Sequence, residues 1–240
     1  MLMTYSRGFF ALQVDFARTA AKLARLPLER ALLGYTNLYI RFGLGRDFLD
    51  DHPTWRRYTD GLASGADVYD WTHQFYLAQG EDSRPTAGSE CFSHAMHANY
   101  VRIHFRNAEP TKASPLSAER LPARLGELRS IFEHVKQNTP EATTVVGTSW
   151  LYNLPAYRRC FPEAYVTSAQ PASPRYRHVS LWGQFLDRSG MLRKNAVDEF
   201  ARSLSGISDT RDLHLAFPLQ ALALEAPISA FYRFYGIADH

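Results

Sequence analysis

Residues 145–162 read VVGTSWLYNLPAYRRCFP, and they decide the layout that we expect for the second part of the chain. The β-branched run at residues 141–148 predicts a buried strand. Polar and aromatic residues follow at 149–153, and a short helix is expected to start near Pro155. In α/β sheets, ligands gather outside the carboxyl ends of strands, where loops lead into helices. The segment therefore indicates an α/β fold and a place for a binding site.

Further strands and helices are expected on both sides of this segment. Residues 91–107 (CFSHAMHANYVRIHFRN) predict a hairpin that turns near Ala98 and Asn99, and a long helix with an apolar stripe follows from Ser117. The remaining pattern predicts a strand over residues 178–186, a helix through Phe200, a strand over 219–224 and a helix over 227–235. Alternating strands and helices predict an α/β (α+β) layered domain.

The first 80 residues have helical periodicity instead. Helices are expected over residues 15–26 and 28–42, then after His52 and after Ser64. The polar stretch 80–90, GEDSRPTAGSE, is the clearest linker. We therefore predict a helical N-terminal segment at 1–80 and an α/β domain at 91–240, and the sequence leaves open whether the two pack as one unit.

Composition excludes several classes of function. The chain has 45% hydrophobic and 21% charged residues with a net charge of +3, as in ordinary globular proteins. Basic residues form no concentrated run, which argues against nucleic-acid binding. Two cysteines fit a reducing compartment, and no stretch of roughly 20 apolar residues predicts a membrane span. We expect a cytoplasmic protein that acts on a small molecule.

Three familiar catalytic arrangements are not supported by the motifs. His94, His97 and His104 lie close in sequence, but residues three apart in a strand point to opposite faces, and HExxH is absent, so no metal site is predicted. Ser149 follows a strand but lacks the second small residue of the G-x-S-x-G turn. Neither GxxxxGK[ST] nor GxGxxG occurs.

Five residues are candidates for substrate or cofactor binding. Ser149, Trp150 and Tyr152 come directly after the predicted strand, where a ligand-facing loop is expected. Trp182 and Gln184 flank a glycine inside another predicted strand, where glycine permits close approach of a ligand or a backbone. Each of these residues has an alternative explanation as core or as a helix cap.

Three stretches carry a resemblance to a known family. PLSAERLPARLGELRSIFEHV followed by TTVVGTSWLYNLPAYRRCFP is similar to the helix–strand–SWL pattern of an uncharacterised bacterial group that resembles GNAT-type N-acyltransferases. The tail APISAFYRFYGI resembles the GNAT signature of a helix that carries Phe-Tyr before a Gly-containing end. This resemblance implies a GNAT-like mixed sheet and acyl transfer from acyl-CoA to a small amine.

The resemblance also implies roles for individual residues. Tyr232 matches the tyrosine that protonates the departing thiolate, and a phenol is chemically suited to that role. The base is Glu225, or a water held by Gln184 or His104, and the sequence does not choose among them. The pyrophosphate-binding Q/R-x-x-G-x-G/A loop is absent. The alternatives are therefore a non-catalytic small-molecule-binding or interaction protein and, third, a metal-dependent hydrolase.

Overall fold

The computed structural model describes residues 4–45, 48, 50–79, 90–108, 114–172, 176–177 and 179–238. Two compact units make up the chain, and each unit takes two separate stretches of sequence. The helical unit comprises Met1–Pro85 and Ser173–Gln220, and the sheet unit comprises Thr86–Ala172 and Ala221–His240. The predicted range 91–240 thus contains residues of both units. The predicted linker at 80–90 lies outside the described residues except for Glu90.

The helical unit is held together by an aromatic core. Phe16 of the first helix lies 5.0 Å from Phe217 and 5.7 Å from Trp182 between ring centroids, and all three side chains are buried. Aromatic side chains bury large apolar areas, so this cluster joins the two stretches of the unit. Its helices are α1 (Arg7–Ala24), α2 (Leu28–Tyr35), α3 (Leu38–Arg41), α4 (Pro53–Ala63), α5 (Val68–Ala78), η3 (Trp182–Phe185), α9 (Lys194–Ser205) and η4 (Thr210–Ala216).

Two predictions in this unit need correction. The helix expected over 28–42 is interrupted between α2 and α3, where the Thr36 hydroxyl accepts the Leu38 N–H at 3.3 Å. The strand expected over 178–186 is wrong, because η3 is a 3₁₀ helix. There the buried Gln184 amide bonds the backbone of Leu181 and Leu219 and thereby replaces a strand ladder.

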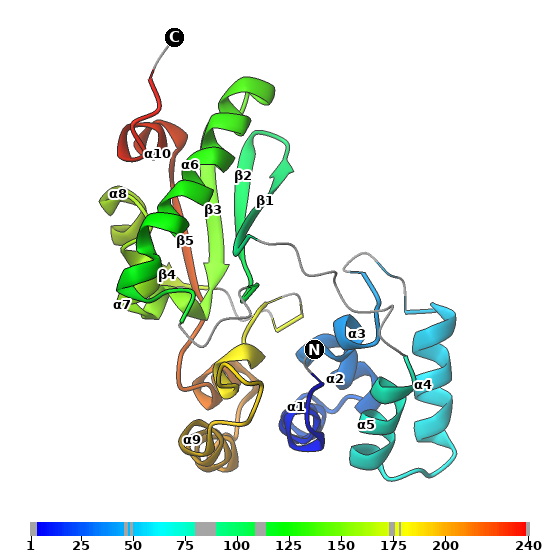
Figure 1. The fold of residues 1–240 in the computed structure, drawn as a ribbon. Coiled ribbons are helices and arrows are strands. Elements are labelled where there is room, and N and C mark those ends of the chain that lie inside the picture. Colours follow the sequence, from blue (N-terminus) through cyan, green and yellow to red (C-terminus); the bar gives the residue numbers. More distant parts are fainter. Residues whose placement is uncertain are drawn as a thin grey trace. The chain divides into compact units, whose positions relative to one another are not determined.

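The sheet unit contains a five-stranded mixed sheet in the order β1-β2-β3-β5-β4 (Figure 1). Only β2 and β3 are parallel, and the other pairs are antiparallel. The mixed α/β class and the helical N-terminus are confirmed. The elements are β1 (Phe92–His97), β2 (Tyr100–Phe105), η1 (Ala118–Arg120), α6 (Leu121–Asn138), β3 (Thr144–Ser149), η2 (Trp150–Asn153), α7 (Pro155–Arg158), α8 (Glu163–Thr167), β4 (Gln170–Pro171), β5 (Leu222–Pro227) and α10 (Ile228–Phe234).

Local sequence explains most of these elements. The hairpin turns at the predicted place, where Ala98 has a φ of 50°. The predicted strand at 219–224 is observed three residues later, as β5. No helix within the described ranges is long and apolar enough to cross a membrane.

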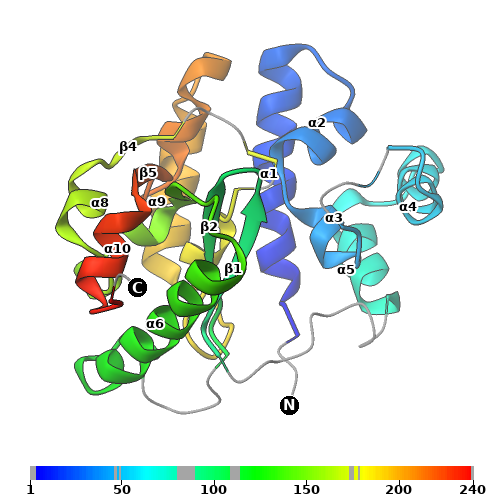
Figure 2. The same cartoon turned by 90° about the horizontal axis from the view of Figure 1, so that it is seen from above.

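The helices of the sheet unit pack on one face of its sheet. We call this the helix-covered face, and α6 and α10 lie on the same side of the strands (Figure 2). Its strand residues belong to the buried core and alternate along each strand with residues of the opposite face. The helix-covered face carries Val101, Ile103, Val145, Gly147, Leu224 and Ala226, and the opposite face carries Tyr100, Arg102, His104, Thr144, Val146, Thr148 and Glu225.

Candidate functional site

The two parallel strands of the sheet are paired only over the first part of their length. Their register covers three residue pairs and ends where Arg102 lies opposite Val146. Both strands continue through residues 103–105 and 147–149, which we call the diverging strand ends. Backbone groups that point from one diverging end toward the other have no ladder partner in the described sheet. Such groups require hydrogen bonds, and ligands of α/β folds bind at this end of parallel strands.

A network of buried tyrosines lies on the helix-covered side of these ends. The hydroxyls of Tyr152 and Tyr165 are 2.8 Å apart, and Tyr157 also hydrogen-bonds Tyr152. A side chain on Gly147 of β3 would place its Cβ 2.1 Å from the Tyr152 hydroxyl and 2.2 Å from that of Tyr165. The strand therefore has a glycine here because two phenols occupy the space of a side chain.

Burial determines the protonation state of this network. Loss of solvation raises the pKa of Tyr152 to about 12, although its hydrogen bonds to Tyr165 and Tyr157 oppose the change. Burial also raises the pKa of Tyr157 and Tyr165 well above the usual value. All three phenols are therefore protonated at neutral pH, and the raised pKa makes each a weaker acid than a free tyrosine.

The opposite face presents a different set of groups at the same place. Arg102, His104 and Thr148 lie on this face and are partly buried. The Arg102 Nε is buried without a hydrogen-bond partner, and no ion pair to Arg102 exists within the described residues. Glu225 is exposed on the same face but belongs to β5, on the far side of β3.

The three predicted catalytic residues are not brought together. His104 is at the diverging strand ends, and Glu225 is two strands away on the same face. Tyr232 lies on α10, which packs on the helix-covered face and follows β5 near the start of β3, where the Ile228 N–H donates to the Thr143 carbonyl at 2.9 Å. Its ring lies 4.8 Å from Lys136 Nζ. Tyr232 is therefore at the other end of β3 from Ser149.

Residues 149–153 form a packed corner with local hydrogen bonds. Ser149 caps η2, because its hydroxyl accepts the Leu151 N–H at 3.2 Å. Asn153 donates to the Trp150 carbonyl at 2.8 Å, and the Trp150 side chain is partly exposed. Tyr152 is 2% exposed and belongs to the core. Of the three predicted binding residues, Trp150 alone keeps a partly exposed side chain without a structural role that the contacts explain.

Trp182 and Gln184 belong to the helical unit, and both side chains are buried. Trp182 packs in the aromatic core, and Gln184 uses its amide oxygen and nitrogen on backbone groups. These contacts give both residues a structural explanation.

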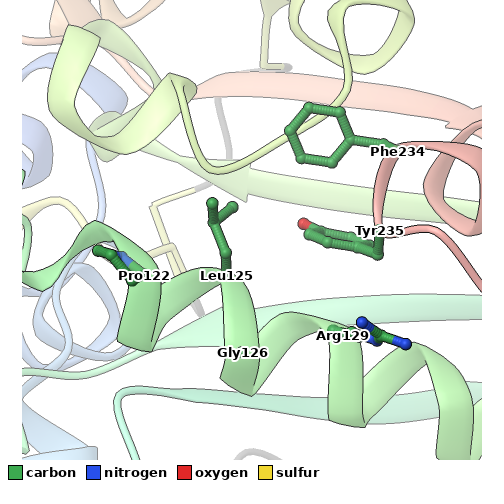
Figure 3. A pocket seen from close by; sticks show the side chains of 6 residues that line it. All are labelled: Pro122, Leu125, Gly126, Arg129, Phe234 and Tyr235. Atoms are coloured by element: carbon green, nitrogen blue, oxygen red, sulfur yellow. The ribbon is translucent and has the colours of Figure 1, made fainter.

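The sheet unit also has a shallow groove of about 420 Å³ between α6 and α10 (Figure 3). Leu125 points from α6 toward the rings of Phe234 and Tyr235, whereas the Arg129 side chain points away along the helix (Figure 3). Gly126 adds no side chain to the floor, and Arg129 is paired with Glu133 at 2.8 Å. The groove therefore offers apolar contact with few polar groups to orient a ligand.

The histidines of the hairpin do not converge. His94 lies opposite Ile103, His97 opposite Tyr100, and His104 opposite Ser93. Across the described part of the chain, no group of three or more His, Cys, Asp or Glu side chains is arranged to hold a metal ion. The described residues thus give the metal-dependent hydrolase no support.

Sequence reasoning missed Arg102 and the buried pair of Arg124 and Glu127. Arg124 donates to the Glu127 carboxylate at 2.6 Å and to the Cys91 sulfur at 2.7 Å. The sequence pattern could have placed Arg102 on the opposite face, since it stands between two apolar residues of a strand and must point away from their face. The Arg124–Glu127 pair was harder to predict, because its sequence pattern is only a three-residue spacing within a helix.

Comparisons of the chain with protein-family models, with curated proteins and with solved structures find no match. Its function is therefore inferred from its own residues and their geometry.

Proposed function

We propose that the chain is an acyl-CoA-dependent N-acyltransferase that acylates a small amine at the diverging strand ends. The supporting observation is the short register of β2 with β3, which stops at Arg102 and Val146 although both strands continue. The resemblance of the SWL stretch to GNAT-type enzymes points to the same strand, β3. The diverging strand ends combine unpaired strand edges with titratable groups near both faces.

The unpaired edges suit a donor with a long amide-containing arm. Acyl-CoA has such an arm, and its amides are able to bond the strand groups that lack ladder partners. The thioester carbonyl would then lie between the two faces near Gly147 and His104. Backbone N–H groups at this position would stabilise the oxyanion that forms on attack.

The proton acceptor lies on the opposite face of the sheet, and the proton donor lies on the helix-covered face. The amine nitrogen attacks the thioester carbon, so that a C–N bond forms and the C–S bond breaks. His104 accepts the proton that the amine loses, and Tyr152 supplies the proton that the thiolate gains. We assign this acid to Tyr152 instead of Tyr232, because Tyr152 contacts β3 at the diverging end, whereas Tyr232 lies at the other end of β3.

Binding and turnover test this proposal separately. Acetyl-CoA, longer acyl-CoAs and free CoA are compared for their effect on thermal unfolding, and thiol release is followed with a panel of amines. Ligands that bind the folded state raise its stability, so a shift is expected with acyl-CoA. His104→Gln should lower kcat about 100-fold or more while the shift persists.

The two tyrosines are compared in the same assay. Tyr152→Phe should reduce kcat, and Tyr232→Phe should not. The reverse result would assign the acid to Tyr232, as the resemblance implies. No stabilisation by any acyl-CoA at saturation would contradict the enzyme proposal.

One observation favours a second candidate, a non-catalytic binding protein. The sequence lacks the Q/R-x-x-G-x-G/A loop before α6, so the usual cradle of backbone amides for pyrophosphate is missing. Stabilisation by acyl-CoA without thiol release toward any amine would support this candidate.

A further inference from the structure

We propose that Arg102 binds an oxyanion on the acceptor, so that the substrate is an amine with a carboxylate or phosphate on a short spacer. This inference rests on the proposed acyl transfer and adds the class of acceptor to it. It is carried by the state of Arg102 and by what surrounds it on the opposite face.

Arg102 is a partly buried residue whose guanidinium has no ion-pair partner among the described residues. Its Nε is buried and makes no hydrogen bond, and the described residues provide it with no ion pair. An unsatisfied buried donor is costly, and a charged one more so. Arg124 in the same unit is the internal comparison, because its Nε also lacks a partner but its two terminal nitrogens are bonded to Glu127 and to Cys91.

The neighbours of Arg102 leave its charge uncompensated. Ala95 of β1 and Val146 of β3 lie directly opposite it on the same face. The nearest carboxylate on this face of the described sheet is Glu225, which pairs with Val146 on the far side of β3. Two strand spacings separate Arg102 from Glu225, about 10 Å. A ligand oxyanion would therefore meet a guanidinium that no protein carboxylate occupies.

The surrounding polar groups fit the same ligand. Tyr100 and His104 lie two residues away on the same strand and face, and Thr148 is on the facing part of β3. Each carries a group able to donate a hydrogen bond to oxygen. The planar fork of arginine matches carboxylate and phosphate in a bidentate way. The environment selects for an oxyanion and against a second cation.

The spacing along β2 limits the length of the substrate. Residues 102 and 104 are about 7 Å apart along a strand. An amine positioned at His104 and an oxyanion positioned at Arg102 are thus joined by a spacer of a few atoms. Matched probes of this length are 4-aminobutanoate and its uncharged analogue 4-aminobutanamide, and the phosphate pair is O-phosphoethanolamine and ethanolamine.

The test measures kcat/KM for each pair with the wild type, Arg102→Gln and Arg102→Lys, using acetyl-CoA as donor. Wild type should prefer the anionic probe of at least one pair by about tenfold or more, as a charged hydrogen bond predicts. Arg102→Gln should remove this preference by lowering kcat/KM for the anionic probe. Arg102→Lys should give an intermediate preference, because the charge remains and the fork is lost.

Controls separate this inference from loss of folding. Arg233→Gln removes an exposed guanidinium of α10 and should keep the wild-type preference. Thermal unfolding confirms that each variant is folded, and Arg102→Lys replaces Arg102→Gln if the latter is not.

Direct binding distinguishes the failure of this inference from the failure of the proposed function. Calorimetry with the same four probes needs no turnover. Acyl transfer without preference for either anionic probe, or a preference that survives in both Arg102 variants, overturns the inference alone. Anion binding that depends on Arg102 in a chain that transfers no acyl group overturns the acyltransferase proposal and keeps the oxyanion site. Neither transfer nor anion binding overturns both.

Discussion

The two faces of the sheet treat polar side chains in opposite ways. On the helix-covered face, Tyr152 and Tyr165 bond each other, and Arg124 bonds Glu127. On the opposite face, the Arg102 Nε has no partner and the described residues offer its guanidinium no ion pair; the Arg124 Nε also lacks a partner, but its terminal nitrogens are bonded. Polar groups that serve the fold are expected to be bonded within it, since an unpaired buried group costs stability. The difference teaches where to look for a ligand, namely at Arg102 on the opposite face.

The largest effect is expected from breaking the buried ion pair of the helix-covered side. Glu127→Gln leaves the Arg124 charge buried without its counter-ion, and we expect a loss of about 3 to 5 kcal/mol in the free energy of unfolding. Urea denaturation measures the loss. Glu133→Gln is the matched control in the same helix, because its pair with Arg129 is exposed and is worth less than about 1 kcal/mol. Equal losses in the two variants would contradict the prediction that the Arg124–Glu127 pair contributes more to stability than the exposed pair.

A methyl group on β3 should have the next largest effect. Gly147→Ala places its Cβ within 2.2 Å of two buried hydroxyls, so the tyrosine network must shift. We expect destabilisation of about 1 to 3 kcal/mol from overpacking, measured by the same denaturation. Gly126→Ala on α6 meets nothing within 4 Å and should be stabilising by about 0.5 to 1 kcal/mol. A stable Gly147→Ala protein would show that the phenols do not occupy this space.

A single hydroxyl of the network should matter less. Tyr165→Phe removes the bond to Tyr152 but keeps the ring and its contact with Phe231 at 5.0 Å. We expect a loss of about 1 kcal/mol, which is typical of one hydrogen bond. Thermal unfolding of the two single variants and the Tyr152→Phe/Tyr165→Phe double variant gives the coupling. Strictly additive losses would mean that the two hydroxyls do not interact.

The smallest effect is a pH dependence on the helix-covered face. Burial, and then the nearby His134, lowers the pKa of His94 below its usual value of 6.5. The unfolded chain then binds the proton more readily, so stability should decrease as the pH falls below about 6.5 toward the lowered pKa. Thermal midpoints between about pH 5 and 8 measure this in wild type and His94→Gln, which should have a flatter profile. His97→Gln, on the opposite face, should leave the pH dependence of the thermal midpoint as in wild type. A flatter pH profile in His97→Gln would contradict the attribution of this dependence to His94.

Local sequence predicted much of the fold and less of the site. The hairpin at Ala98, the long helix α6 and the strand β3 follow from turn residues and periodicity, which act over short distances. The 3₁₀ turn at Trp182–Phe185 depends on the bonds of Gln184 to Leu219, a residue far along the chain, so the local pattern was misleading. Tyr152 is buried and its hydroxyl bonds Tyr165, a contact that the local pattern does not predict. The position of Tyr232 relative to His104 depends on the sheet order, which periodicity does not encode.

The interleaving of the two units constrains the order in which the chain is able to fold during synthesis. The helical unit needs Ser173–Gln220, and the sheet unit needs β5, which begins at Leu222. The helical unit therefore lacks part of its core until residues 173–220 have been made, after most of the sheet unit. The usual order during synthesis, in which one complete N-terminal domain folds before the next is made, does not fit this arrangement. Until the second stretch is present, Phe16 lacks its contacts with Trp182 and Phe217.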